Sequence, residues 1–111
     1  MLLLAAGPAA AQDAKHGKVL FEPCARCHSF KDNGIGPNLR GVVGRKAAAV
    51  KGYDYSPALK HSFIVWDEAS LNAYLAAPRI ILPRTTMRGA GVEVADPQDR
   101  RDVIAYMKVA R

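Results

Sequence analysis

The sequence has few cysteines and no long apolar run. Only two of its 111 residues are cysteine, Cys24 and Cys27, so a framework of several disulfides is excluded. No stretch approaches the roughly 20 consecutive apolar residues that a membrane-spanning helix requires, so we expect no transmembrane protein. The length is enough for one domain and too short for two.

The sequence also lacks the additional ligands that a zinc site at the cysteine pair would need. There is no third cysteine, and two of the three histidines, His16 and His61, stand alone. A redox-active dithiol of the thioredoxin kind is expected in a βαβ context, which the sequence does not show. A redox dithiol or a structural disulfide stays open as the weaker alternative.

The stretch Cys24-Ala25-Arg26-Cys27-His28 carries the strongest chemical signal. The two thiols lie three residues apart on one helical turn, so each sulfur can add to one vinyl group of a haem. His28 follows directly, and its imidazole can meet the iron from the same side. This is the spacing of c-type haem attachment. The motif therefore predicts one covalent haem c with its iron, which would also give a small domain a large apolar centre.

Positive charge exceeds negative charge along the chain. There are 16 Lys and Arg residues against 10 Asp and Glu residues, for a formal net charge of +6. A basic surface favours acidic partners. Nucleic acid is the weaker interpretation, because the basic residues are scattered and no DNA- or RNA-binding motif accompanies them.

Residues 1–11 form an apolar run followed by small residues suited to cleavage near Ala11. We interpret them as the remnant of a signal peptide whose positively charged front is missing, with a flexible N-terminal tail as the alternative. The functional domain is then expected over residues 12–111. Since haem attachment of this type belongs to an exported compartment, this interpretation predicts an exported protein.

Four helices are predicted, separated by long loops. They cover residues 14–24, a short segment from Pro57 after the N-cap Ser56, a segment capped by Asp67 that ends near residue 77, and residues 97–110 after the N-cap Asp96. Residues 29–52 and 78–95 are expected to be loops, and residues 63–66 an extended core segment without a pairing strand. The buried faces are expected at Val19, Leu20, Phe21, Leu71, Tyr74, Leu75, Val103, Ile104 and Met107.

Further motifs follow in order along the chain. They are Gly17 and Phe21 before the cysteine motif, Gly36-Pro37-Asn38-Leu39, Gly44-Arg45-Lys46, Gly52-Tyr53-x-Tyr55-Ser56, Ile64-Val65-Trp66-Asp67-Glu68, Leu71-x-x-Tyr74-Leu75, Pro83-x-Thr85-x-Met87 and Asp102-Val103-Ile104-Ala105-Tyr106. This ordered set resembles class I cytochromes c, of the mitochondrial type and its small bacterial relatives. The resemblance implies an all-α cytochrome c fold, with three to five helices wrapped around one covalently bound haem.

The resemblance also implies an iron ligand set. Met87 would be the second axial ligand opposite His28, and its neutral thioether would favour ferrous iron and raise the reduction potential. Taken alone, Met87 is an ordinary core or loop methionine, and the flanking Pro83 and Thr85 change that interpretation. The Pro37 carbonyl would accept a hydrogen bond from His28 and orient its ring.

Other site residues follow from the same resemblance. Arg45, Tyr55 and Trp66 would hold the inner haem propionate, and Ser56 the neighbouring one. Tyr74 would place its hydroxyl near the Met87 sulfur. Gly17 and Tyr106 would mark where the first and last helices cross.

Several positions depart from the family pattern. The loop after the cysteine motif is shorter than in the mitochondrial form, which points to a bacterial relative. Arg84 stands where a glycine is usual, Gly89 where an aromatic residue is usual beside the haem edge, and Leu59 where a polar residue is usual. These departures leave the ligands intact.

The expected function is that of a soluble, monomeric, periplasmic electron carrier rather than an enzyme. It would shuttle single electrons between membrane redox complexes, because His and Met ligation leaves the iron without an open position. Partners would be respiratory or photosynthetic donors and oxidases with acidic docking faces, bound through Arg26, Arg79, Arg84 and Arg88. A haem peroxidase that frees its iron is the enzymatic alternative, although no distal acid–base pair is evident. A module of a larger redox complex is the third.

Overall fold

The computed structural model describes residues 12–89 and 91–111, so the predicted signal-peptide remnant at residues 1–11 lies outside the described residues. Helices predominate, and the sheet among the described residues has two strands of two residues each. The elements are α1 (Ala14–Leu20), the 3-10 helix η1 (Cys24–Arg26), β1 (Arg45–Lys46), α2 (Pro57–Lys60), β2 (Val65–Trp66), α3 (Glu68–Ala76), α4 (Pro78–Ile81) and α5 (Pro97–Val109). The all-α prediction is confirmed.

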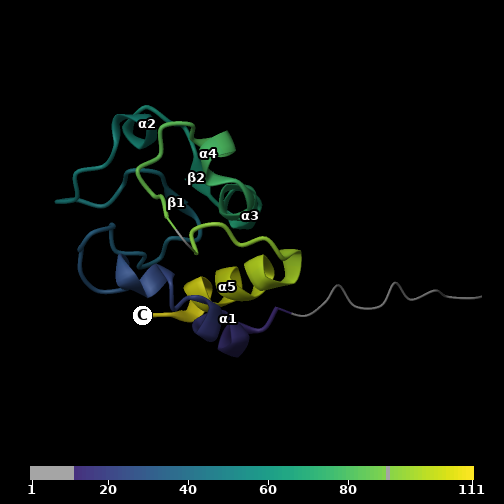
Figure 1. Ribbon diagram of the computed structural model, residues 1–111. Coiled ribbons are helices and arrows are strands. Elements are labelled where there is room, and N and C mark those ends of the chain that lie inside the picture. The colour runs from purple at the N-terminus through teal and green to yellow at the C-terminus, as the bar shows by residue number, and fades with distance from the viewer. Residues whose placement is uncertain (1–11, 90) are drawn as a thin grey trace, which may run out of the picture.

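The first and last helices lie side by side along one edge of the molecule (Figure 1). Gly17 of α1 is buried there, and a Cβ at this position would lie 1.9 Å from the backbone oxygen of Asp102 and 2.9 Å from the Cβ of Tyr106. Only glycine allows so close an approach. The predicted crossing of the two helices at Gly17 and Tyr106 is therefore confirmed.

The helix starts agree with the capping residues in the sequence. Ser56 accepts a hydrogen bond from the Leu59 amide, Asp67 from the Ser70 amide, and Asp96 from the Gln98 amide. Asp67 belongs to a full capping box, since the Ser70 hydroxyl in turn accepts from the Asp67 amide. Local side-chain chemistry thus sets where these helices begin.

The first helix is shorter than predicted. α1 ends at Leu20, and η1 follows after Pro23. Proline has no amide hydrogen to continue the helical pattern, which explains the break. Val19 is 66% exposed, contrary to the prediction, because it lies two residues from Gly17 and so faces away from α5, whereas Phe21 is buried.

Two further predictions about loops are wrong. The expected extended core segment at residues 63–66 does have a pairing partner, since Arg45 pairs with Trp66 and Lys46 with Val65 in antiparallel register. It is also not core throughout, because Phe63 is fully exposed and Val65 is exposed, whereas Trp66 is buried. The partner strand lies in a glycine-containing stretch about 20 residues back, where no local pattern signals a strand. Residues 78–81 form α4 rather than loop, because Pro78 ends α3 and also occupies the first position of the next helix.

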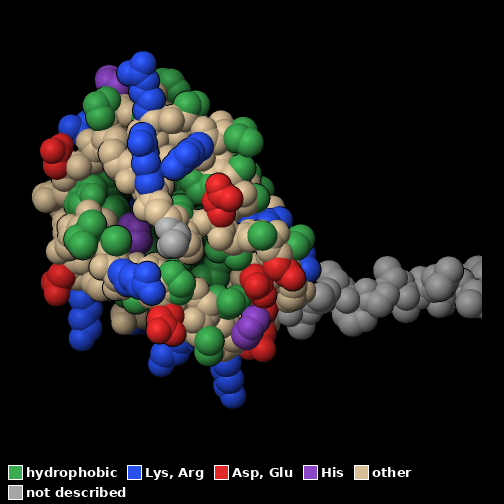
Figure 2. Space-filling model, in the orientation of Figure 1, with side chains coloured by type: hydrophobic (Ala, Val, Ile, Leu, Met, Phe, Trp, Pro, Cys, Tyr) green, Lys and Arg blue, Asp and Glu red, His purple; other side chains and the backbone are tan. Residues whose placement is uncertain are grey.

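The core lies between the helix pair α1 and α5 and the remaining elements (Figure 1). The predicted inward residues Leu71, Tyr74 and Leu75 of α3 are all buried, as are Val103, Ile104 and Met107 of α5. In the described part of the chain, no helix is long and apolar enough to cross a membrane. Figure 2 shows acidic side chains gathered toward the lower right of one face, with Lys and Arg side chains both above and below them.

Candidate haem site

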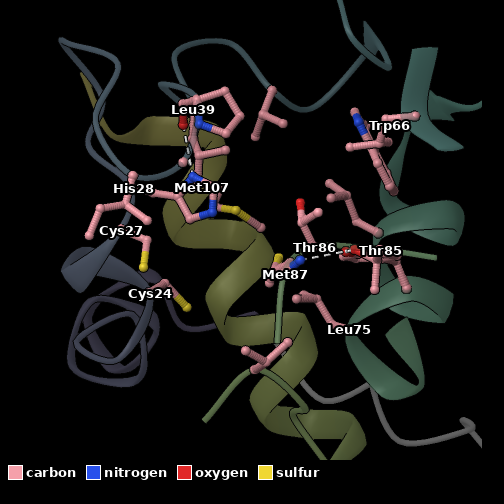
Figure 3. A pocket seen from close by; sticks show the side chains of 18 of the residues that line it. Cys24, Cys27, His28, Leu39, Trp66, Leu75, Thr85, Thr86, Met87 and Met107 are labelled. Atoms are coloured by element: carbon pink, nitrogen blue, oxygen red, sulfur yellow. Dashed lines mark hydrogen bonds between the residues drawn. The ribbon is translucent and has the colours of Figure 1, made fainter. Parts of the chain in front are cut away.

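One cavity of about 280 Å³ lies between α3, α5 and the loops that connect the helices. All ten site residues that the sequence predicts line it. They are Cys24, Cys27, His28, Pro37, Arg45, Tyr55, Ser56, Trp66, Tyr74 and Met87. The structure thus brings residues from distant parts of the sequence to one mainly apolar space, as Figure 3 shows for several of them.

The cysteine pair lies on one side of this cavity, in and directly after η1 (Figure 3). The His28 amide donates to the Cys24 carbonyl at 2.9 Å, which closes the turn and brings the imidazole beside the thiols. No disulfide joins Cys24 and Cys27, so the alternative of a structural disulfide finds no support. Burial raises the pKa of the Cys24 thiol above its ordinary value.

The imidazole of His28 is held from two sides. Its Nδ1 donates to the Pro37 carbonyl oxygen at 2.8 Å, since a carbonyl can only accept. The ring also lies against Gly36, where a Cβ would come within 2.4 Å of the His28 Cε1. Burial lowers the pKa of His28, which favours the neutral ring with a free Nε2 lone pair. Sequence reasoning found the Pro37 contact but not the close fit of Gly36.

Met87 enters the cavity from the opposite wall (Figure 3). Its backbone amide donates to the Thr85 hydroxyl at 3.2 Å, and that hydroxyl lies 2.6 Å from the Tyr74 hydroxyl. Thr85 is 1% exposed, and burial raises the pKa of Tyr74. Tyr74 therefore reaches the Met87 segment through Thr85, and its predicted position beside the Met87 sulfur stays a prediction. Met107 of α5 also lines the cavity.

The guanidinium of Arg45 is half-buried, and one of its N–H groups has no hydrogen-bond partner. Its Nη1 donates to the Arg40 carbonyl at 2.8 Å and its Nη2 to the Asn38 carbonyl at 3.0 Å. Its Nε is buried without a hydrogen-bond partner. Burial also lowers the pKa of Arg45, because it removes water from around the cation. The sequence contained no signal for the two carbonyl partners.

An anionic group in the cavity could accept the missing hydrogen bond from Arg45 Nε, and a haem propionate is such a group. The Tyr55 hydroxyl, also in the cavity wall, accepts from the Val50 amide at 3.1 Å and keeps its own proton to donate. Ser56 is engaged as the N-cap of α2. The apolar lining, the thiol pair, the nitrogen and sulfur donors and the orphaned Nε–H all fit a haem.

The sequence model of the family described as Cytochrome c matches residues 14–110. The chain belongs to the cytochrome c family. A cytochrome c of Euglena viridis is 46% identical over 102 residues, which cover 89% of this chain and 98% of the relative. A cytochrome c2 of Rhodomicrobium vannielii is 40% identical over 109 residues, covering 96% and 86%.

Solved structures agree with this membership. The structure of cytochrome cH from Methylobacterium extorquens has a TM-score of 0.82 at 45% identity, covering 86% of this chain and 97% of the other. This cytochrome c accordingly carries one covalently attached haem c with its iron, and its relatives are electron carriers. The predicted family, fold and cofactor are confirmed.

Proposed function

We propose that this cytochrome c is a periplasmic electron carrier that shuttles single electrons between membrane redox complexes, with its haem iron ligated by His28 and Met87. The arrangement that supports this ligand set is the placement of the His28 ring and the Met87 side chain on facing walls of one cavity, with the cysteine pair beside His28. Two strong axial ligands leave no position for a substrate, which suits transfer without bond making.

The haem supplies one-electron chemistry at its iron when bound. The residues of this chain position its ligands and surround its propionates. Pro37 keeps the Nδ1 proton of His28 in place, so that Nε2 remains the free donor. Thr85 and Tyr74 hold the backbone before Met87, which limits how far its sulfur can move. Arg45, Tyr55, Trp66 and Ser56 are proposed to surround the propionates.

The location and organisation that we propose follow from the chemistry of attachment. Residues 1–11 would be a signal-peptide remnant and residues 12–111 the haem-carrying domain, acting as a monomer in the periplasm. Exposed arginines that include Arg79 and Arg88, which flank Met87, would attract the acidic docking faces of donors and oxidases. Transient, salt-sensitive docking of this kind suits a carrier that must leave its partner quickly.

One observation favours a second candidate, peroxidase activity. Gly89 is exposed beside Met87, and a Cβ there would have nothing within 4 Å, so the polypeptide leaves this side of the methionine open. If Met87 leaves the iron, peroxide could reach it from this side. Significant peroxide turnover by the native ferric protein would favour this candidate over the carrier.

The ligand set is tested with two methionine variants. Both Met87 and Met107 line the cavity, so Met107→Leu is a matched control for Met87→Leu. The ferric wild type should show the near-infrared band of an iron–thioether bond, and Met87→Leu should lose it while Met107→Leu retains it. The band lost in Met107→Leu and kept in Met87→Leu would contradict the proposal.

The carrier role is tested by reversible oxidation and reduction of the haem protein. We expect a one-electron couple, and a reaction with an acidic partner that slows as salt is added. Replacing Arg79, Arg84 and Arg88 by Gln should slow this reaction most at low salt. A rate indifferent to both salt and arginine replacement would argue against basic docking.

A further inference from the structure

The polypeptide around Met87 is attached to α3 on both sides of the methionine. Before it, the Thr85 hydroxyl accepts from the Met87 amide and lies 2.6 Å from the Tyr74 hydroxyl of α3. After it, the Val94 amide donates to the Leu75 carbonyl at 2.9 Å. Leu75 lies in the last turn of α3, where carbonyl groups lack intrahelical partners, so this bond serves both the helix and the segment.

Residues 85–95, here named the Met87 segment, have little internal support between these attachments. For the described residues in between, the backbone–backbone hydrogen bonding consists of the Val92 amide donating to the Gly89 carbonyl, at a long 3.4 Å. Gly89 and Gly91 have φ values of +117° and +83°, and glycine leaves the backbone free to move. The position of Met87 therefore depends on how firmly the two ends of the segment are held.

Arg100 of α5 holds the far end of this segment. Its Nη1 donates to the Val94 carbonyl at 2.8 Å and to the Ala95 carbonyl at 2.9 Å. Its Nε donates to the side-chain oxygen of Asn72 on α3 at 2.7 Å. Because the guanidinium is a rigid planar fork, the bond to Asn72 fixes the direction in which Nη1 points. One charged side chain thus joins α5, α3 and the end of the Met87 segment.

The neighbouring Arg101 makes a different set of contacts. Its Nε and Nη2 donate to the side-chain oxygen of Gln98, at 3.3 and 2.7 Å, on the same helix. The two arginines carry the same charge at adjacent positions of α5, but it is Arg100 whose guanidinium bonds to the Met87 segment. Arg101 is therefore a matched control for Arg100.

We infer that Arg100 is a positioning residue for Met87. By holding residues 94–95 against α3, it limits how far the Met87 segment moves away from the cavity and how often the thioether leaves the iron. This inference rests on the proposed ligation of the iron by Met87. It gives a role in keeping the axial position closed to a side chain that is not part of the cavity lining.

The test measures imidazole binding to the ferric haem protein, because imidazole coordinates the iron only when the thioether is displaced. The apparent affinity is the intrinsic affinity scaled by the fraction of molecules in which this position is open. Imidazole should bind Arg100→Leu about tenfold more tightly than wild type, because the lost charge-assisted hydrogen bonds no longer oppose opening. Arg101→Leu, which removes the same charge from the same helix, should equal wild type.

A second variant acts on the same contact from α3. Asn72→Leu removes the acceptor of Arg100 Nε and keeps the guanidinium, so it should increase the imidazole affinity by a smaller factor. Asn72 is exposed, so this variant keeps the test available if Arg100→Leu does not fold. In that case, wild-type imidazole affinity of Asn72→Leu would overturn the inference.

Met87→Leu separates positioning from general loosening of the fold. With no thioether to displace, the additional replacement Arg100→Leu should leave the imidazole affinity of Met87→Leu unchanged. Denaturant unfolding of each haem protein measures global stability alongside. If Arg100 were merely structural, its replacement would lower this stability and leave the imidazole affinity of the Met87 protein at the wild-type value.

An Arg100→Leu protein with wild-type imidazole affinity would overturn the inference, whatever its stability. So would an equal increase in affinity in the presence and in the absence of Met87. Failure of the proposed ligation gives a different result, because Met87→Leu would then keep the near-infrared band and bind imidazole no more tightly than wild type.

Discussion

Two regions of the molecule differ in where their polar groups find partners. They are the crossing of α1 and α5 and the wall of the haem cavity. At the helix crossing every contact described above is made by the protein itself. Gly17 packs on the Asp102 backbone, and the Asp102 carboxylate accepts from the backbone amide of Asp13, the side-chain Nε2 of Gln98 and the His16 ring. In the cavity wall, Arg45 Nε lacks a partner and Met87 is only partly buried.

This difference indicates that the molecule has one self-sufficient edge and one side that needs its cofactor. Changes at the helix crossing should act mainly on folding. Changes in the cavity wall should act on the reduction potential as well as on stability, because we propose that the groups there surround the haem.

The largest expected effect is that of Gly17→Val at the helix crossing. The new side chain would meet the Asp102 backbone, which cannot move as a flexible side chain can, so we expect a loss of about 3 kcal/mol or more. Denaturant unfolding of the haem protein measures it. The control is Gly41→Ala, where φ is +61° and nothing lies within 4 Å of the Cβ, with an expected loss of about 1–2 kcal/mol. Equal losses in the two variants would contradict the close-approach argument.

Arg45→Leu should have the next largest effect. It leaves the carbonyls of Asn38 and Arg40 without a donor, for an expected loss of about 1–3 kcal/mol. It also removes a cation from the cavity wall, so the reduction potential should fall. Potentiometry together with unfolding checks both effects. A variant with lower stability and an unchanged potential would show that Arg45 is purely structural.

Gly36→Ala should have a smaller effect on stability, of about 1–2 kcal/mol. Its methyl group would press on the His28 ring and disturb the bond to Pro37. Gly34→Ala is the matched control, because its Cβ would lie 3.7 Å from the Cys27 oxygen, an ordinary contact. We expect the ferric spectrum and the potential to change in the first variant only. Two unchanged spectra would mean that the ring tolerates the methyl group.

The smallest expected effect is a pH dependence at the helix crossing. The hydrogen bond to Asp102 raises the pKa of His16 above 6.5, and the bond to His16 lowers the pKa of Asp102 below 3.8. The contribution of His16 is therefore complete below 6.5 and lost as pH rises through its raised pKa. That of Asp102 is lost as pH falls below 3.8.

Wild type should exceed His16→Gln in melting temperature by the widest margin near about pH 5, and the margin should shrink toward about pH 9. Asp13 and Asp99 also raise the pKa of His16, so the pH dependence reflects its interaction with three carboxylates and not with Asp102 alone. A margin independent of pH would show that the His16 bond does not depend on its charge.

Local signals in the sequence were sufficient for much of the site. The cysteine motif predicted the haem, and the order of the motifs predicted the family, both of which are confirmed. Such predictions succeed because attachment chemistry and helix capping depend on residues within a few positions of one another. The predictions for Ser56, Asp67 and Asp96 as caps held for this reason.

Only the tertiary structure decided the contacts between distant segments. The pairing of Arg45 with Trp66 has no local signal in the sequence, and the exposure of Ile80 and Val19 follows from where α4 and α1 pack. Each depends on which surface the rest of the chain presents to that segment. The sequence alone determined which chemical groups this cytochrome c brings to its haem, whereas packing decided which of them are buried, which remain without a partner and which face water.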